Sequence, residues 1–192
     1  MSVLYVGLSV QSSVRAWAGG ARAEGRRLVR LLDRKRGGSG KIAVADSGRP
    51  YFADGHADFS VSHSGRTVAA AYSRARSAQT GRLLRVGCDI EYIRPGKSRE
   101  EIAERFFAPP ERAYIRGASP ETERLARFYR VWVLKECYLK IFGWSIFAIS
   151  RVPAFSDGYR LAASSETARF YPFELETPSG DRYSLAVGIE NG

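Results

Sequence analysis

The sequence has little cysteine, histidine and methionine. Its 192 residues include two cysteines, two histidines and one methionine. Cysteines and histidines this few and this scattered cannot form a typical zinc site. Cys88 and Cys137 are expected to be small buried side chains, and a reducing, cytoplasmic location is then the default.

Long apolar runs are also absent. No stretch approaches the roughly 20 apolar residues that cross a bilayer. The first ten residues lack a charged segment followed by an apolar one, and polar Gln11-Ser12-Ser13 comes next. We therefore expect neither a membrane span nor a signal peptide.

Negative charge is scarce relative to positive charge. Lys and Arg number 30 against 20 Asp and Glu, which gives a net charge of +10. This excess implies an anionic partner: nucleic acid, a phosphate-rich small molecule, an acidic protein or a membrane surface. Most of the positive residues are arginine, which can hold phosphate with two donors at once. The length allows a substantial core in one or two small domains.

The most informative stretch is a predicted strand, Val86-Gly87-Cys88-Asp89-Ile90-Glu91. Side chains alternate between the two faces of a strand. Asp89 and Glu91 therefore point the same way, and Ile90 points into the core. An isolated pair of acids like this one is also common at a solvated strand edge.

A predicted helix at 128–140 carries the matching residues. Positions four apart share one face of a helix, so Trp132, Glu136 and Lys140 form a single stripe. Glu136 and Lys140 alone could be a surface ion pair, and we expect Trp132 to be a core residue. If the stripe lies over the strand, three carboxylates and one ammonium converge. Such a set suits Mg²⁺ beside a phosphate group.

Helices and strands alternate along the rest of the chain. The segments 67–72 and 83–91 are expected to be neighbouring strands joined by a long hairpin loop, and 67–72 also resembles 183–188. Ser98 and Ser119 are expected helix caps, with Pro120 first in its helix. We expect helices at 21–35, 98–106, 109–117 and 119–143, and strands at 3–10, 42–45, 51–52, 59–61, 67–72, 83–91, 147–151, 159–163, 168–176 and 182–189.

Several motifs occur in a fixed order. They are Gly48-Arg49-Pro50-Tyr51-Phe52, Phe59-Ser60-Val61-Ser62-His63-Ser64-Gly65, Gly87-Cys88-Asp89-Ile90-Glu91, Phe106-Phe107 and Trp132-x-x-Lys135-Glu136-x-x-x-Lys140. Together they resemble the signature of the 4′-phosphopantetheinyl transferase superfamily, in its larger, surfactin-synthetase-activating (Sfp-like) type. The resemblance covers roughly residues 45–145 and is specific as a combination.

The resemblance implies an α+β fold. Two similar α/β halves, residues 1–84 and 85–192, would be related by a pseudo-twofold axis, with the active site in the cleft between them. Fused halves would make the monomer self-sufficient.

The resemblance also implies a reaction. The 4′-phosphopantetheine arm of coenzyme A would move onto a serine of an apo acyl or peptidyl carrier protein, with Mg²⁺ as cofactor and 3′,5′-ADP as leaving product. Asp89, Glu91 and Glu136 would hold the Mg²⁺. Glu136 would also be the general base, and Lys140 would donate to the leaving phosphate.

Other positions match the family's contacts to coenzyme A. His63 and Ser62 would bind a phosphate; without the resemblance, His63 would be read as a turn residue. Arg49 would grip a phosphate or be a solvated turn residue. Lys135 would either support the site or touch a phosphate, and Glu111 would be a motif acid or a helix cap.

One part of the pattern is missing. Larger family members carry a longer basic segment that grips the nucleotide's 3′-phosphate, and here this region is short. Arg15, Arg22 and Arg26 are the nearest substitutes. The main alternative is a basic nucleic-acid-binding module without catalysis, which lacks a recognisable reader motif or stacking platform. A divergent inactive relative is a further alternative. We therefore expect a carrier protein and coenzyme A as partners, and no nucleic acid or membrane.

Overall fold

The structure is a computed structural model that describes residues 3–11, 19–96, 99–156, 162 and 164–192. It combines helices with antiparallel sheets and is of the α+β class, as expected. Arg15, Ser98 and, apart from position 162, the strand expected at 159–163 lie outside the described residues. None of the helices within these ranges is long and apolar enough to cross a membrane.

The first sheet is formed by residues before position 84. Its strands pair antiparallel in the order β1-β5-β4, and β2 and β3 form a separate hairpin. Leu28 and Val29 of the first helix pack against Val68 and Tyr72 in one core, which explains the leucine spacing seen in the sequence. The elements are β1 (Tyr5–Val10), α1 (Gly20–Arg34), β2 (Ile42–Val44), β3 (Pro50–Phe52), β4 (Asp58–Ser64) and β5 (Thr67–Ser73).

The second sheet follows in the order β6-β8-β7, also antiparallel. Its long helix lies along β6 and β8. A Cβ added at Gly87 would stand 2.4 Å from the carbonyl oxygen of Cys137, so a glycine is needed where helix and strand approach this closely. The elements are β6 (Val86–Tyr92), α2 (Arg99–Phe106), α3 (Pro109–Arg116), α4 (Glu121–Phe142), the 3₁₀ helix η1 (Ile146–Arg151), β7 (Ala168–Glu176) and β8 (Arg182–Glu190).

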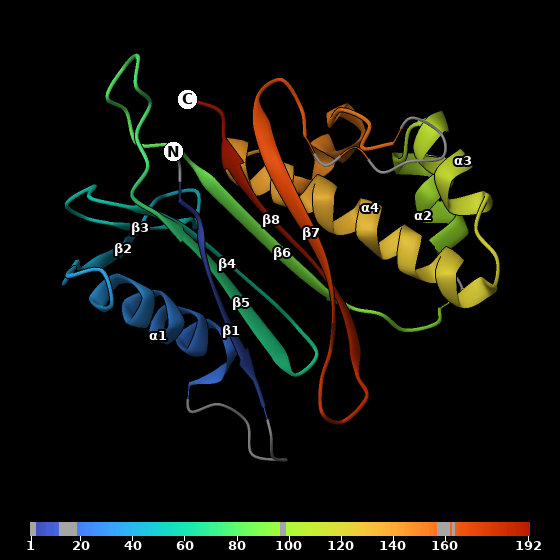
Figure 1. Cartoon of the computed structure of the whole chain (residues 1–192), viewed down its shortest axis with the longest axis horizontal. Helices are drawn as coiled ribbons and strands as arrows, with labels where there is room; N and C mark the ends of the chain where they lie inside the picture. Colours follow the sequence, from blue (N-terminus) through green and yellow to red (C-terminus); the bar gives the residue numbers. More distant parts are fainter. Residues whose placement is uncertain (1–2, 12–18, 97–98, 157–161, 163) are drawn as a thin grey trace.

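The two sheets share one connectivity. In each, a first strand leads through helical structure to a hairpin whose last strand takes the middle place. The similar segments 67–72 and 183–188 belong to these middle strands, β5 and β8. A common core joins the sheets, with Ala71 of β5 against Cys88 and Leu185. Figure 1 shows α1 and α4 on the outer sides, with the strands of both sheets between them.

Strands β4 and β6 connect the two sheets. They run side by side in the same direction, since hydrogen bonds pair Asp58 with Val86 at one end and Ser64 with Tyr92 at the other. The amide of Val86 donates to Asp58 Oδ2 at 2.7 Å near one end, and the amide of Tyr92 donates to Ser64 Oγ at 3.0 Å near the other. Side chains of β4 thus satisfy part of the edge of β6 that faces away from β8.

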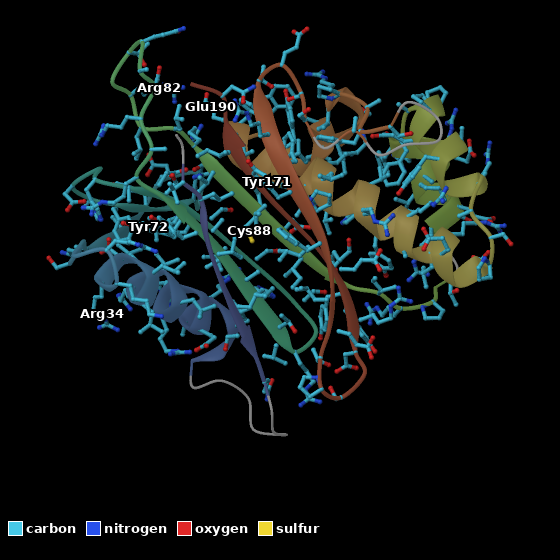
Figure 2. All side chains as sticks on the ribbon, viewed as in Figure 1. Arg34, Tyr72, Arg82, Cys88, Tyr171 and Glu190 are labelled. Carbon is cyan, nitrogen blue, oxygen red and sulfur yellow. The ribbon has the colours of Figure 1, made fainter. Side chains whose placement is uncertain are left out.

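The structure corrects three predictions. The segment 83–91 is not paired with β5; both edges of β5 are taken by β1 and β4, so β6 pairs with β8 instead. This pairing of β6 with β8 is accompanied by an ion pair of 2.8 Å between Arg82, in the loop before β6, and Glu190 at the end of β8 (Figure 2). The segment predicted as a strand at 147–151 lies in η1, where the Ser145 side chain caps the first turn. Pro120, not Ser119, occupies the cap position of α4.

Candidate active site

Strand β6 presents its two acids toward helix α4. Gly87 faces Cys137 of that helix, and strand alternation puts Asp89 and Glu91 on the same side. Cys88 points the other way into the core between the sheets (Figure 2). The sequence prediction for this strand is therefore reproduced by the structure.

Helix α4 presents the expected stripe. Between positions 131 and 140, Trp132, Glu136 and Lys140 are partly exposed and the other residues are buried. The buried residues include Cys137, and burial raises the pKa of Cys88 to about 12 and that of Cys137 well above its usual value. Both cysteines are thus inert core residues, and the partly exposed stripe is the part of this helix segment that a ligand can reach.

Asp89 and Lys140 form the centre of the site. Lys140 Nζ donates to Asp89 Oδ1 at 2.6 Å and to the carbonyl oxygen of Cys88 at 3.0 Å. Ser62 Oγ donates to the same Asp89 oxygen at 2.7 Å. The other carboxylate oxygen, Asp89 Oδ2, is buried without a hydrogen-bond partner among the described residues.

Glu91 has a partner that the sequence analysis missed. Ser64 Oγ donates to Glu91 Oε2 at 2.8 Å. Ser62 and Ser64 are two residues apart on β4 and so share a face, and that face meets both acids of β6. The two-residue spacing of Ser62 and Ser64 could have predicted this contact, because it puts both hydroxyls on the same face of β4.

The carboxylates crowd one another electrostatically. Burial, reinforced by the Asp89 charge, raises the pKa of Glu136 to about 7, although the Lys140 ammonium opposes the shift. Burial also raises the pKa of Glu91, against the Ser64 hydrogen bond. Burial would lower the pKa of Lys140, but the Asp89 carboxylate outweighs it and raises the value. The negative charge of these carboxylates is thus only partly compensated by Lys140.

The donor set suits a hard divalent cation. Within the described ranges, no group of three His, Cys, Asp or Glu side chains is already arranged as metal ligands. The unpartnered Asp89 Oδ2 and the raised pKa values of Glu91 and Glu136 nevertheless mark a place where positive charge is missing. Oxygen-only ligands of this kind fit Mg²⁺.

The residues expected to contact coenzyme A fall into two places. Ser62 touches the acids, whereas His63 is exposed on the opposite face of β4. That face is the one covered by α1, because a Cβ at Gly25 would meet Val61 Cγ1 at 2.4 Å. Arg22 and Arg26 flank Gly25 and are exposed on α1. No contact in the described residues connects these two arginines to Asp89, Glu91 or Glu136.

Lys135 lies in the protein interior. Its side chain is 1% exposed, and Nζ stands 3.1 Å from Glu111 Oε2 and 3.3 Å from the carbonyl oxygen of Val152. Glu111 also accepts the amides of Ala108 and Phe155. Of the two roles expected for Lys135, its burial favours support over a phosphate contact, and the contacts of Glu111 correspond to its expected role as a helix cap.

Arg49 is held within the protein framework beside a cavity. Its guanidinium contacts the carboxylate of Asp58 at 2.9 Å, the carbonyl oxygen of Val86 at 3.1 Å and the carbonyl oxygen of Lys140. The cavity has a volume of about 440 Å³ and is lined by Arg49, Lys140 and Trp144 among others. Both terminal nitrogens of the Arg49 guanidinium therefore contact protein oxygens.

Acids and a lysine gathered where two sheets meet are typical of sites that handle phosphate groups. The chain belongs to the 4′-phosphopantetheinyl transferase superfamily, which residues 85–187 match. The family expected from the sequence motifs is therefore confirmed.

Curated relatives agree with this assignment. The chain is 31% identical over 119 residues to the 4′-phosphopantetheinyl transferase HetI of Nostoc, a segment covering 60% of this chain and 46% of the relative. It is 34% identical over 123 residues to AcpT of Salmonella typhimurium, covering 64% and 59%. It is 32% identical over 101 residues to Sfp of Bacillus subtilis, covering 52% and 40%. The chain thus spans about half the length of the curated relatives it matches.

Proposed function

We propose that this protein transfers the 4′-phosphopantetheine arm of coenzyme A to a serine of an apo acyl or peptidyl carrier protein and releases 3′,5′-ADP. The observation that carries the proposal is the contact of Lys140 with Asp89 beside β4, with Glu91 and Glu136 near enough for their charges to interact with that of Asp89. The relatives named above are phosphopantetheinyl transferases, and they give no support to the nucleic-acid-binding alternative.

The proposal includes the arrangement of the molecule. Residues 1–84 and 85–192 would be two halves related by a pseudo-twofold axis, with the site in a cleft between them. The shared strand order of the two sheets supports this. So does the position of Asp89, whose partners are Ser62 from one half and Lys140 from the other. A site formed by both halves of one chain would make the monomer self-sufficient.

The chemistry divides among named side chains. Asp89, Glu91 and Glu136 would hold Mg²⁺, which supplies charge neutralisation for the pyrophosphate of coenzyme A. Glu136 would accept the proton of the carrier serine as general base. It is suited to this role because it lies on the partly exposed stripe of α4, which a substrate can reach. Lys140 would turn its ammonium from Asp89 to the leaving phosphate, where a flexible point charge is well suited.

Substrate contacts would come from both sides of β4. Ser62 lies beside Asp89 and would donate to a phosphate near the acids. His63, Arg22 and Arg26 are exposed on the α1 side and would hold a more distant phosphate. The net charge of +10 would attract coenzyme A and the acidic surface of a carrier protein in the cytoplasm.

The test is transfer itself. The protein is incubated with coenzyme A, Mg²⁺ and several apo carriers, both acyl and peptidyl, and each carrier is weighed by mass spectrometry. The expected result is the added mass of the phosphopantetheine arm on at least one carrier, and its loss when a chelator replaces Mg²⁺. The Asp89→Ala variant should give no product, and circular dichroism should show that it is folded. Carriers that all remain unmodified by the wild-type protein would refute the proposal.

A further inference from the structure

Arg49 joins three elements at one point. Its Nη1 donates to the carbonyl oxygen of Lys140 in α4, and its Nη2 donates to Asp58 of β4 at 2.9 Å and to the carbonyl oxygen of Val86 in β6 at 3.1 Å. The side chain is 19% exposed. A residue from the turn before β3 therefore fastens the end of α4 to the start of β6.

The carbonyl oxygen of Lys140 needs a hydrogen-bond donor from outside helix α4. Lys140 belongs to the last turn of α4, which ends at Phe142. Carbonyl oxygens in a last turn have no partner within the helix, and they carry partial negative charge. A guanidinium satisfies such an oxygen with a strong, charge-assisted hydrogen bond. The contact thus fixes the main chain of the residue whose side chain reaches Asp89.

Asp58 fixes the orientation of Arg49. One oxygen, Asp58 Oδ2, accepts both the Arg49 guanidinium at 2.9 Å and the amide of Val86 at 2.7 Å. The carboxylate therefore ties the arginine to the same strand whose carbonyl the arginine also holds. Both Nη atoms that could grip a phosphate are already engaged with protein oxygens.

We propose that Arg49 is a positioning residue: oriented by Asp58, it sets the backbone of Lys140 against β6 so that the Lys140 ammonium meets Asp89. This inference rests on the proposed transferase function. Lys140 is then located twice, through its carbonyl oxygen by Arg49 and through its ammonium by Asp89 and Cys88. Because both Nη atoms of Arg49 contact protein oxygens, we expect the Kd for coenzyme A to change little when these contacts are lost.

The test compares two variants. Arg49→Lys keeps the charge but loses the two-nitrogen guanidinium that contacts Lys140 and Val86, and Asp58→Asn weakens the orientation of the guanidinium without removing the arginine. Arg30→Lys, an exposed residue of α1, is the matched control. Turnover, the KM for coenzyme A and the calorimetric Kd for coenzyme A are measured on each folded variant. We expect turnover to fall about tenfold or more for Arg49→Lys and Asp58→Asn while the Kd stays within about twofold of wild type, because a small misplacement of a reacting group costs rate and not binding.

The contrary pattern would overturn the inference. A tenfold or larger increase in Kd with unchanged turnover for Arg49→Lys, or wild-type turnover for Asp58→Asn, means that Arg49 is a phosphate contact or plays no part in positioning. Amide hydrogen exchange separates this from failure of the transferase proposal. If the wild-type protein transfers nothing, faster exchange at Val86 and in the last turn of α4 in both variants still supports the positioning role of Arg49. Unchanged exchange refutes that role.

Discussion

The hydroxyl of Ser62 donates a 2.7 Å hydrogen bond to the same oxygen of Asp89 that Lys140 contacts at 2.6 Å. A strand of the first sheet and the long helix of the second therefore meet on one carboxylate. This shared contact makes the chemistry of the site depend on how the two sheets are held together.

Replacing Glu136 with glutamine should abolish carrier modification. The amide has nearly the same shape but cannot accept the serine proton, and a lost general base costs on the order of 100-fold or more in rate. Turnover is measured with saturating coenzyme A and carrier. Glu121→Gln changes an exposed residue at the start of the same helix and should stay close to wild type. A Glu136→Gln rate within a few-fold of wild type would remove this residue from the mechanism.

Replacing Ser64 with alanine should weaken the binding of Mg²⁺. Ser64 orients Glu91 through its 2.8 Å hydrogen bond, and loss of such an orienting partner lowers metal affinity by about tenfold. The Mg²⁺ concentration that gives half-maximal turnover should rise by that factor, with turnover largely restored at high Mg²⁺. Ser165→Ala, at a serine distant in sequence from β4, is the control. An unchanged Mg²⁺ dependence would show that Glu91 needs no help from β4.

Breaking the buried pair of Lys135 and Glu111 should destabilise the fold. The side chains are 1% and 0% exposed, and removing one partner of a buried ion pair leaves an uncompensated charge at a cost of about 3–5 kcal/mol. Lys135→Met and Glu111→Gln are each compared with wild type by denaturant unfolding. The double variant should lose less than the sum of the two single losses, since the charges matter to each other. Additive losses would mean that the pair does not act as a unit.

Stability should depend on pH through His56. Burial would lower the pKa of His56, but hydrogen bonds to Asp54 and Asp33, at 2.5 Å and 2.7 Å, outweigh it and raise the pKa above 6.5. Burial opposes ionisation of Asp33, yet His56 and the amide of Gly40 hold its pKa below 3.8. Charged His56 therefore stabilises the fold fully below pH 6.5 and loses this effect as pH rises through the raised pKa, while Asp33 contributes above pH 3.8.

The measurement is the Tm of wild type and of His56→Gln across this range. The difference between the two should be largest between pH 3.8 and pH 6.5 and should shrink at alkaline pH. Arg30→Lys should show no such dependence. A difference that is constant up to about pH 9 would mean that His56 does not gain a proton in the folded protein.

The local periodicities of the sequence predicted much of this protein. The two-residue period of β6 put Asp89 and Glu91 on one face, and the 3.6-residue period of α4 put Glu136 and Lys140 on one stripe, because these relations depend only on backbone geometry. The order of the motifs also indicated the family. Burial of Cys88 and Cys137 followed from the same alternation.

The tertiary structure decided which elements meet and what each charged group touches. The sequence order of the strands suggested that β6 pairs with β5, its predecessor. Both edges of β5 are occupied by β1 and β4, so β6 pairs with β8. Likewise the sequence shows Arg49 and Lys135 only as cations in motifs. Whether a cation faces a cleft, an orphan helix carbonyl or a buried acid depends on distant segments that pack around it. Those contacts are set by the fold as a whole, which no local pattern encodes.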